Sequence, residues 1–113
     1  YIPDHEPALA GIEGRTPEWV SAGGIAREVD LLLHDSQYSE DEYGTRIGWG
    51  HSSVAHAVAF SEAVGAKRLV LFHHEPNHSD KDLEQLEDRA GELSRSLDRP
   101  PTLAREGMAI ELS

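Results

Sequence analysis

Hydrophobic positions in this chain fall into short continuous runs and into longer segments in which they recur every three or four residues. Val29 to Leu33 and Leu69 to Phe72 are too short for a typical helix and rich in bulky side chains, which favours buried strands. Thr102 to Ala104 and Met108 to Leu112 are predicted to be short closing strands. Tyr1 to Pro3 resembles the end of a strand, so we expect the chain to be a piece of a longer protein.

Three segments between these runs carry helix signals. Residues 17 to 28 follow a threonine cap and begin with proline, although two glycines interrupt them. Residues 51 to 64 place small apolar side chains on one face, which suits close packing on a sheet. Residues 79 to 97 have leucines at spacings of three and four, typical of an amphipathic surface helix. Strands alternating with helices predict an α/β fold, with residues 4 to 16 and 39 to 43 as loops.

Histidines and acids follow the predicted strands at the points where each strand ends. These junctions are Asp4-His5, His34-Asp35 and His73-His74, and His51 stands at a fourth junction, where a loop enters a helix. In open α/β sheets, ligands bind at the carboxyl ends of the strands. If the strands run side by side, carboxylates and imidazoles gather on one edge as a ligand set for zinc, manganese or iron. The pattern predicts a metal or catalytic site.

Each of these residues also has an ordinary structural interpretation. Asp4 is the kind of acid that caps a turn, and Asp35 can accept hydrogen bonds from nearby backbone amides. His34 is better explained as a hydrogen-bonded core histidine than as a ligand. His51 can simply begin a helix, and His74 should face away from its neighbour because side chains alternate along an extended segment. The site hypothesis therefore rests on the joint pattern.

Other candidates favour structural roles. His56 is expected to be solvated on a helix surface, and His78 is expected to contribute local capping. Tyr38 and Trp49 are more often packing residues than substrate platforms. The acidic run 40 to 42 is expected to be a solvated face.

Composition limits the remaining options. A chain of 113 residues is the size of one domain. Its formal net charge of −11 repels phosphate backbones, so nucleic acid is not the expected partner. The absence of cysteine excludes disulfides and thiolate ligands. No apolar run approaches the length of a membrane span, and we expect a cytoplasmic protein with no membrane partner.

Four motifs in order, YIPDHEP, DLLLHDSQY, GWGHSS and RLVLFHHEP, resemble the carboxyl-terminal half of metallo-β-lactamase-fold hydrolases. The likeness is greatest to the phosphodiesterase branch, which includes the tRNA 3′-processing endonucleases, and it extends through the terminal LAREGMAIEL. It implies that residues 1–113 form one domain portion, half of an αββα sandwich with a mixed sheet covered by helices. The amino-terminal half of that domain would be absent.

The resemblance also implies roles for individual residues. Asp4 matches an aspartate that bridges two metal ions, and His73 matches the last histidine ligand. His51 matches a histidine that assists the leaving group, paired with an acid at the place of Asp35. The family has glutamate there and threonine where this chain has His5, so the pair and the bridging site are expected to differ in detail. The family's upstream His-x-His-x-Asp-His motif does not occur in these residues.

The implied function is metal-dependent hydrolysis of a phosphodiester by a hydroxide that two divalent metal ions activate, with zinc expected first and manganese or iron as alternatives. The substrate would be a small phosphodiester or ester. Two other functions stay open: a catalytically silent binding or regulatory module, and hydrolysis of a lactone or another ester. We expect the isolated chain to be inactive, to bind metal weakly or not at all, and to form a homo-oligomer or aggregate through an uncovered apolar sheet face.

Overall fold

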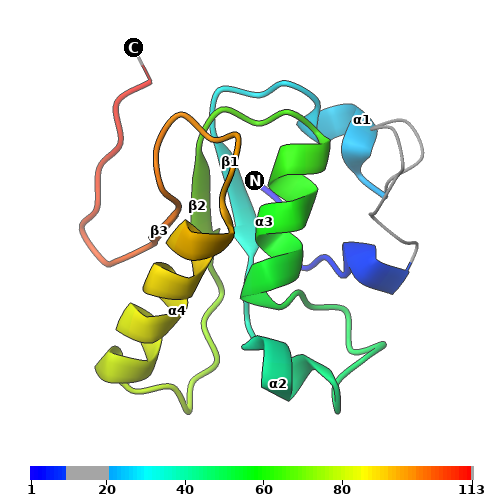
Figure 1. The fold of residues 1–113 in the computed structure, drawn as a ribbon, viewed down its shortest axis with the longest axis vertical. Coiled ribbons are helices and arrows are strands. Elements are labelled where there is room, and N and C mark those ends of the chain that lie inside the picture. Colours follow the sequence, from blue (N-terminus) through cyan, green and yellow to red (C-terminus); the bar gives the residue numbers. More distant parts are fainter. Residues whose placement is uncertain (10–20, 113) are drawn as a thin grey trace.

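The computed structural model of the chain describes residues 1–9 and 21–112. It contains a small parallel sheet with helices packed on it, so the predicted α/β class is confirmed (Figure 1). The shortest dimension is 22 Å, which accommodates one sheet and one helix layer, as expected for half of a sandwich. Among the described residues, no helix has the length and apolar character required to cross a membrane.

The sheet has the strand order β1-β2-β3, with β1 at Leu32–Asp35, β2 at Leu69–Phe72 and β3 at Thr102–Leu103. Both strand pairs run parallel, and Ile2 adds a parallel bridge to His34, so the expected mixed sheet is wrong for the described residues. Burial of the central strand between its neighbours and beneath the helices explains why the sequence of β2 is a continuous apolar run.

Two strand predictions need correction. The first strand begins and ends later than predicted, because His34 and Asp35 are themselves paired in β1 and fully buried. Residues 108 to 112 form no strand, and the chain there is irregular. β2 has the predicted bounds.

Helices α3, Val54–Ala63, and α4, Asp80–Leu93, form where predicted. Their caps are Ser53 and Ser79, which each accept a hydrogen bond from a backbone amide in the first turn. Gly65 adopts a φ of 72° just beyond α3, a conformation that favours glycine. α4 ends four residues before the predicted limit, where Ser94 is already extended.

Three shorter helical elements complete the described fold. α2, Glu40–Tyr43, replaces the acidic loop that we expected, because Ser39 and Glu42 form a capping box that starts a helix. Pro7–Leu9 form a 3-10 turn, η1. α1, Gly23–Ala26, is the described part of the helix predicted over residues 17 to 28, and the rest of that prediction lies outside the described residues.

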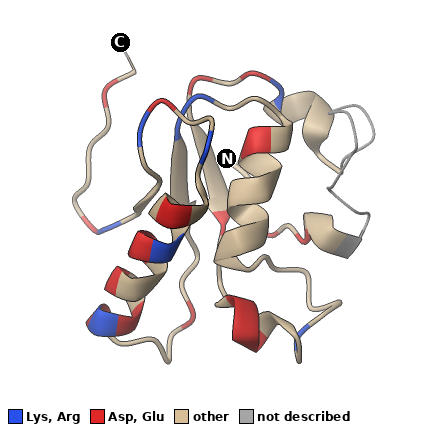
Figure 2. Cartoon of the chain, in the orientation of Figure 1, with Lys and Arg blue, Asp and Glu red and all other residues tan. Residues whose placement is uncertain are grey.

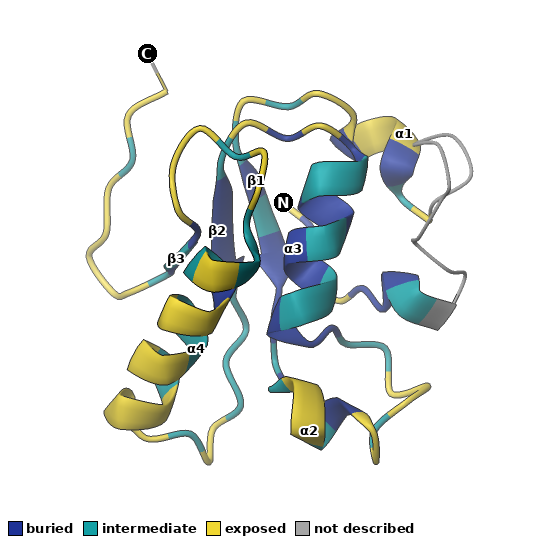
Figure 3. Cartoon of the chain, viewed as in Figure 1, coloured by how far each residue is buried: buried dark blue, intermediate teal, exposed yellow. Residues whose placement is uncertain are grey.

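The core lies between the sheet and helix α3, which contacts β1, β2 and α4 (Figures 1 and 3). It consists of small and branched side chains around Phe60: Ile2, Ala26, Leu32, Val54, Ala57, Val58, Val64, Ala66, Leu69, Leu71, Ala90 and Leu103. This packing fixes the carboxyl ends of β1 and β2 beside the start of α3.

Candidate active site

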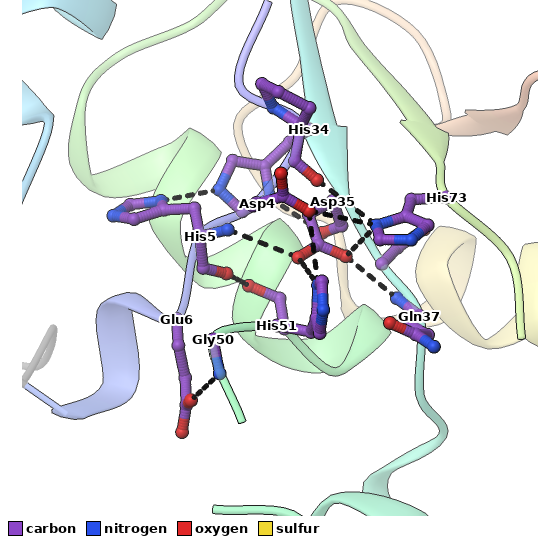
Figure 4. A network of polar contacts seen from close by, with 12 residues as sticks. Asp4, His5, Glu6, His34, Asp35, Gln37, Gly50, His51 and His73 are labelled. Atoms are coloured by element: carbon purple, nitrogen blue, oxygen red, sulfur yellow. Dashed lines mark hydrogen bonds and ion pairs between the residues drawn. The ribbon is translucent and has the colours of Figure 1, made fainter. Parts of the chain in front are cut away.

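The site forms at the carboxyl edge of the parallel sheet. Asp35 pairs with Phe72 across β1 and β2, so His73 emerges next to Asp35. Ile2 bonds to β1 on its other side, with its N–H on Leu33 O at 2.8 Å, and this pairing brings Asp4 to the same edge. His51 comes from the loop before α3, and Figure 4 shows the four side chains together. The spatial condition of the site hypothesis is met.

The strongest contact joins His51 Nδ1 to Asp35 Oδ2 at 2.8 Å. Asp4 Oδ1 lies 3.7 Å from His51 Nδ1 and 3.6 Å from His73 Nδ1. The rings of His51 and His73 meet edge to face, with centroids 4.6 Å apart. One carboxylate is therefore bonded to an imidazole, and a second lies between the two histidines.

Asp35 is held rigidly by the surrounding backbone. Its carboxylate is fully buried and accepts hydrogen bonds from the N–H groups of His5 and Gln37, both at 3.2 Å. Burial raises the pKa of Asp35, while the bonds from His5 and His51 act in the opposite direction. With Nδ1–H of His51 donated to Asp35, only Nε2 of that ring is left for a substrate or a ligand.

Asp4, His51 and His73 could hold a metal ion, because one donor atom from each lies within 4.8 Å of the others. Their carboxylate and imidazole donors suit zinc, manganese or iron. His73 donates Nδ1–H to Pro3 O at 3.2 Å, which leaves the Nε2 lone pair free, as is usual for ligating histidines. The Asp4 side chain is 67% exposed. The donor set fits a divalent cation, with further ligands required to complete its coordination.

His73 also has an unusual backbone. Its φ is 64°, in the left-handed region that residues other than glycine seldom adopt. Such strain persists only where the surrounding structure enforces it, and it gathers at functional sites. The conformation turns the chain at the end of β2 while its ring bonds to Pro3.

The interpretation of His34 as a core histidine agrees with the structure. His34 is fully buried, donates Nδ1–H to Asp35 O at 2.7 Å, and has Nε2 at 2.8 Å from His5 Nδ1. Because the carbonyl can only accept, a neutral His34 accepts at Nε2 from His5. Burial lowers the pKa of His34 to about 4. His34 and His5 thus form a neutral hydrogen-bonded pair, and each also bonds to Asp35.

From the lowered pKa of His34 we expect the folded protein to lose stability in mild acid. Its pKa is lowered on folding, so the unfolded chain binds the proton first, and stability falls as pH drops from 6.5 toward about 4. We expect the free energy of unfolding to decrease by about 2 kcal/mol between about pH 7 and about pH 5 from this residue alone. Urea denaturation at the two pH values measures it. His34→Gln, which keeps a donor and an acceptor, should flatten the dependence, and an unchanged slope would contradict the assignment.

Several other predictions change in the structure. His56 is not solvated: its ring packs edge to face on Tyr43, with centroids 4.7 Å apart, and burial lowers its pKa. His78 bonds to Glu42 at 2.8 Å, and Ser79 caps the helix instead. His74 contacts Ala104 O, apart from the Asp4 and Pro3 contacts of His73, so it faces away as expected. The reason is the turn at His73, whose φ is 64°, and not alternation along an extended segment.

Glu6 is a site residue that the sequence did not reveal. It is 8% exposed and accepts hydrogen bonds of 2.7 Å from Gly48 N–H, Gly50 N–H and Tyr43 OH. Burial alone would raise the pKa of Glu6, but these hydrogen bonds lower it. Burial and the Glu6 carboxylate raise the pKa of Tyr43 to about 12. The only signal in the sequence was the acid two residues after Asp4, and its partners lie more than thirty-five residues away.

No protein-family model matches the chain. It is 32% identical over 110 residues to a protein named Ribonuclease Z from Myxococcus xanthus, a match that covers 97% of this chain and 34% of that relative. Ribonuclease Z from Gemmatimonas aurantiaca is 34% identical over 88 residues, covering 78% of the chain and 26% of the relative. Ribonuclease BN from Cronobacter sakazakii is 30% identical over 84 residues, covering 74% and 27%.

These relatives correct the expectation about nucleic acid. Net charge argued against such a partner, yet the similar proteins are named as ribonucleases. Net charge averages the whole surface, and much of the acidity here lies on α2 and α4 (Figure 2). A phosphate meets only the local surface and any cation bound there. The matches cover about a third of the length of these relatives or less. The chain is similar to one portion of ribonucleases Z and BN.

Proposed function

We propose that this chain is the carboxyl-terminal portion of a metallo-β-lactamase-fold domain, and that the full-length protein is a metal-dependent hydrolase that cleaves RNA phosphodiesters. The observation that carries the proposal is the buried Asp35 bonded to His51, beside Asp4 and His73. Similarity to proteins named ribonuclease Z and ribonuclease BN supports the substrate class.

Asp4 and His73 would hold the metal in this proposal, with other ligands supplied from outside the chain. Divalent cations would polarise the phosphoryl group and lower the pKa of the attacking water. The tautomer of His73 supports its assignment, since Nδ1–H is already donated to Pro3 O. The exposure of Asp4 gives a substrate access to this group.

Asp35 and His51 would manage the proton. The carboxylate fixes the ring through Nδ1, so that Nε2–H would be the donor to the leaving oxygen. Asp35 is anchored by two backbone amides and is buried, so the ring has a fixed support. The aspartate reaches His51 at 2.8 Å, although it is shorter than the glutamate that the family has at this place.

The full-length protein, loaded with zinc or manganese, should cleave an end-labelled single-stranded RNA and bis(p-nitrophenyl) phosphate, and a chelator should abolish both activities. Activity without metal would contradict the mechanism. Cleavage of a lactone but of neither phosphodiester would overturn the substrate class. Absence of all three activities in the metal-loaded protein would favour a silent binding module on the same fold.

A further inference from the structure

The loop that leads to His51 exposes an indole. Trp49 is 64% exposed and stands two residues before His51, so the interpretation of Trp49 as a packing residue is wrong, whereas Tyr38 is buried. The apolar Ile47 in the same loop is also exposed. An exposed indole costs hydration free energy, which a binding partner would recover.

The backbone on both sides of this indole is fixed. Gly48 N–H and Gly50 N–H both donate to Glu6 at 2.7 Å, and both glycines have a φ of 90°. Trp49 N–H donates to Arg46 O at 3.2 Å, which closes a turn. The side chain therefore projects into solvent from a backbone held by hydrogen bonds, and little conformational entropy would be lost on binding.

A cation accompanies the ring. The guanidinium of Arg46 lies 5.7 Å from the centroid of Trp49 and 5.2 Å from that of Tyr38. The guanidinium lies over one face of the indole, so a base would stack on the other face. An aromatic ring paired with an arginine matches a nucleotide, whose base stacks and whose phosphate carries negative charge. The position, two residues from the general acid proposed above, would place that nucleotide near the reacting bond.

We propose that Trp49 is a stacking platform for an unpaired nucleobase of an RNA next to the scissile phosphate, with Arg46 facing the backbone of the same RNA. This inference rests on the proposed function and adds to it the part of the substrate that this chain recognises. Glu6 is the residue that keeps the platform in register with His51.

Stacking on one aromatic side chain contributes about 1–3 kcal/mol per base, so Trp49→Ala in the full-length protein should raise KM for single-stranded RNA by about 5- to 150-fold. Trp49→Phe should retain most of the affinity, because it preserves an aromatic face. Ile47→Ala, in the same exposed loop, is the matched control and should change KM by no more than about twofold.

An abasic RNA separates stacking from a structural effect. With the base removed on either side of the scissile phosphate, wild type and Trp49→Ala should have similar KM values. If the variant is equally impaired on intact and abasic RNA, the indole supports the loop and the proposal is wrong. An unchanged KM on intact RNA would also overturn it.

Fluorescence keeps this test independent of catalysis. The fluorescence of Trp49 is the difference between the emission of the wild type and that of Trp49→Phe. In the full-length protein, this emission should be quenched by RNA and by acrylamide. Shielding from acrylamide without RNA would mean that another part of the protein covers the indole, and would overturn the proposal. If the protein cleaves RNA but RNA does not quench the Trp49 fluorescence, the stacking platform is wrong and the proposed function stands. If RNA quenches the fluorescence but is not cleaved, the proposed function is wrong and RNA binding at Trp49 stands.

Discussion

Replacing His51 with alanine should reduce RNA turnover by the full-length protein by about 10²- to 10⁴-fold, the usual contribution of general acid catalysis. The reason is that Asp35 holds His51 Nδ1 at 2.8 Å, which leaves Nε2–H for the leaving oxygen. Steady-state kinetics on RNA measures the effect. Metal content, measured by mass spectrometry, should remain close to that of the wild type, since Asp4 and His73 are retained.

The leaving group gives the sharper comparison for this variant. Nitrophenolate needs no proton to depart, so His51→Ala should lose far less activity on bis(p-nitrophenyl) phosphate than on RNA. His74→Ala is the control, because His74 bonds to Ala104 O and makes none of the site contacts. Equal losses on both substrates would mean that His51 binds metal or substrate instead of supplying a proton.

The second large effect is expected at His73. His73→Asn should remove bound metal from the full-length protein and reduce its activity to background, because the imidazole is lost while asparagine tolerates the φ of 64°. Alanine would combine the loss of the ligand with backbone strain, so asparagine isolates the ligand effect. Metal content after dialysis and turnover at saturating metal are the two measurements.

The control for His73 is the stability of the metal-free protein. Thermal unfolding in chelator should be nearly the same for wild type and His73→Asn, because the contact with Pro3 O is long and partly exposed. Retention of stoichiometric metal by His73→Asn would remove this residue from the proposed ligand set and leave the dyad proposal standing.

Local signals in the sequence specified much of the fold. The run that became β2 is apolar throughout, and Ser53 and Ser79 sit one residue before α3 and α4. α2 was missed, although its Ser-x-x-Glu capping box was readable, because the acidic composition suggested a solvated loop. β1 was placed too early because its last two residues are polar, and only tertiary partners explain their burial.

The candidate site, like the fold, could be predicted only in part from the sequence. Asp4, Asp35 and His73 meet because parallel backbone segments end at one edge, a rule that needs no coordinates. His51 joins them from the loop before α3. Glu6 could not be recognised, since its three donors come from a distant loop and α2. Trp49 was misjudged because average tendencies of tryptophan say nothing about one loop. The argument from net charge against a nucleic acid partner failed because net charge sums over surfaces that a substrate does not contact.

Three consecutive residues near the amino terminus each serve a different part of this centre. Asp4 lies between the two histidines, His5 donates its amide to Asp35, and Glu6 secures the tryptophan loop. One substitution there disables one of these tasks. Inserting or deleting a single residue shifts the tripeptide's spacing and misaligns all three together, so the length of this segment is more tightly constrained than its composition.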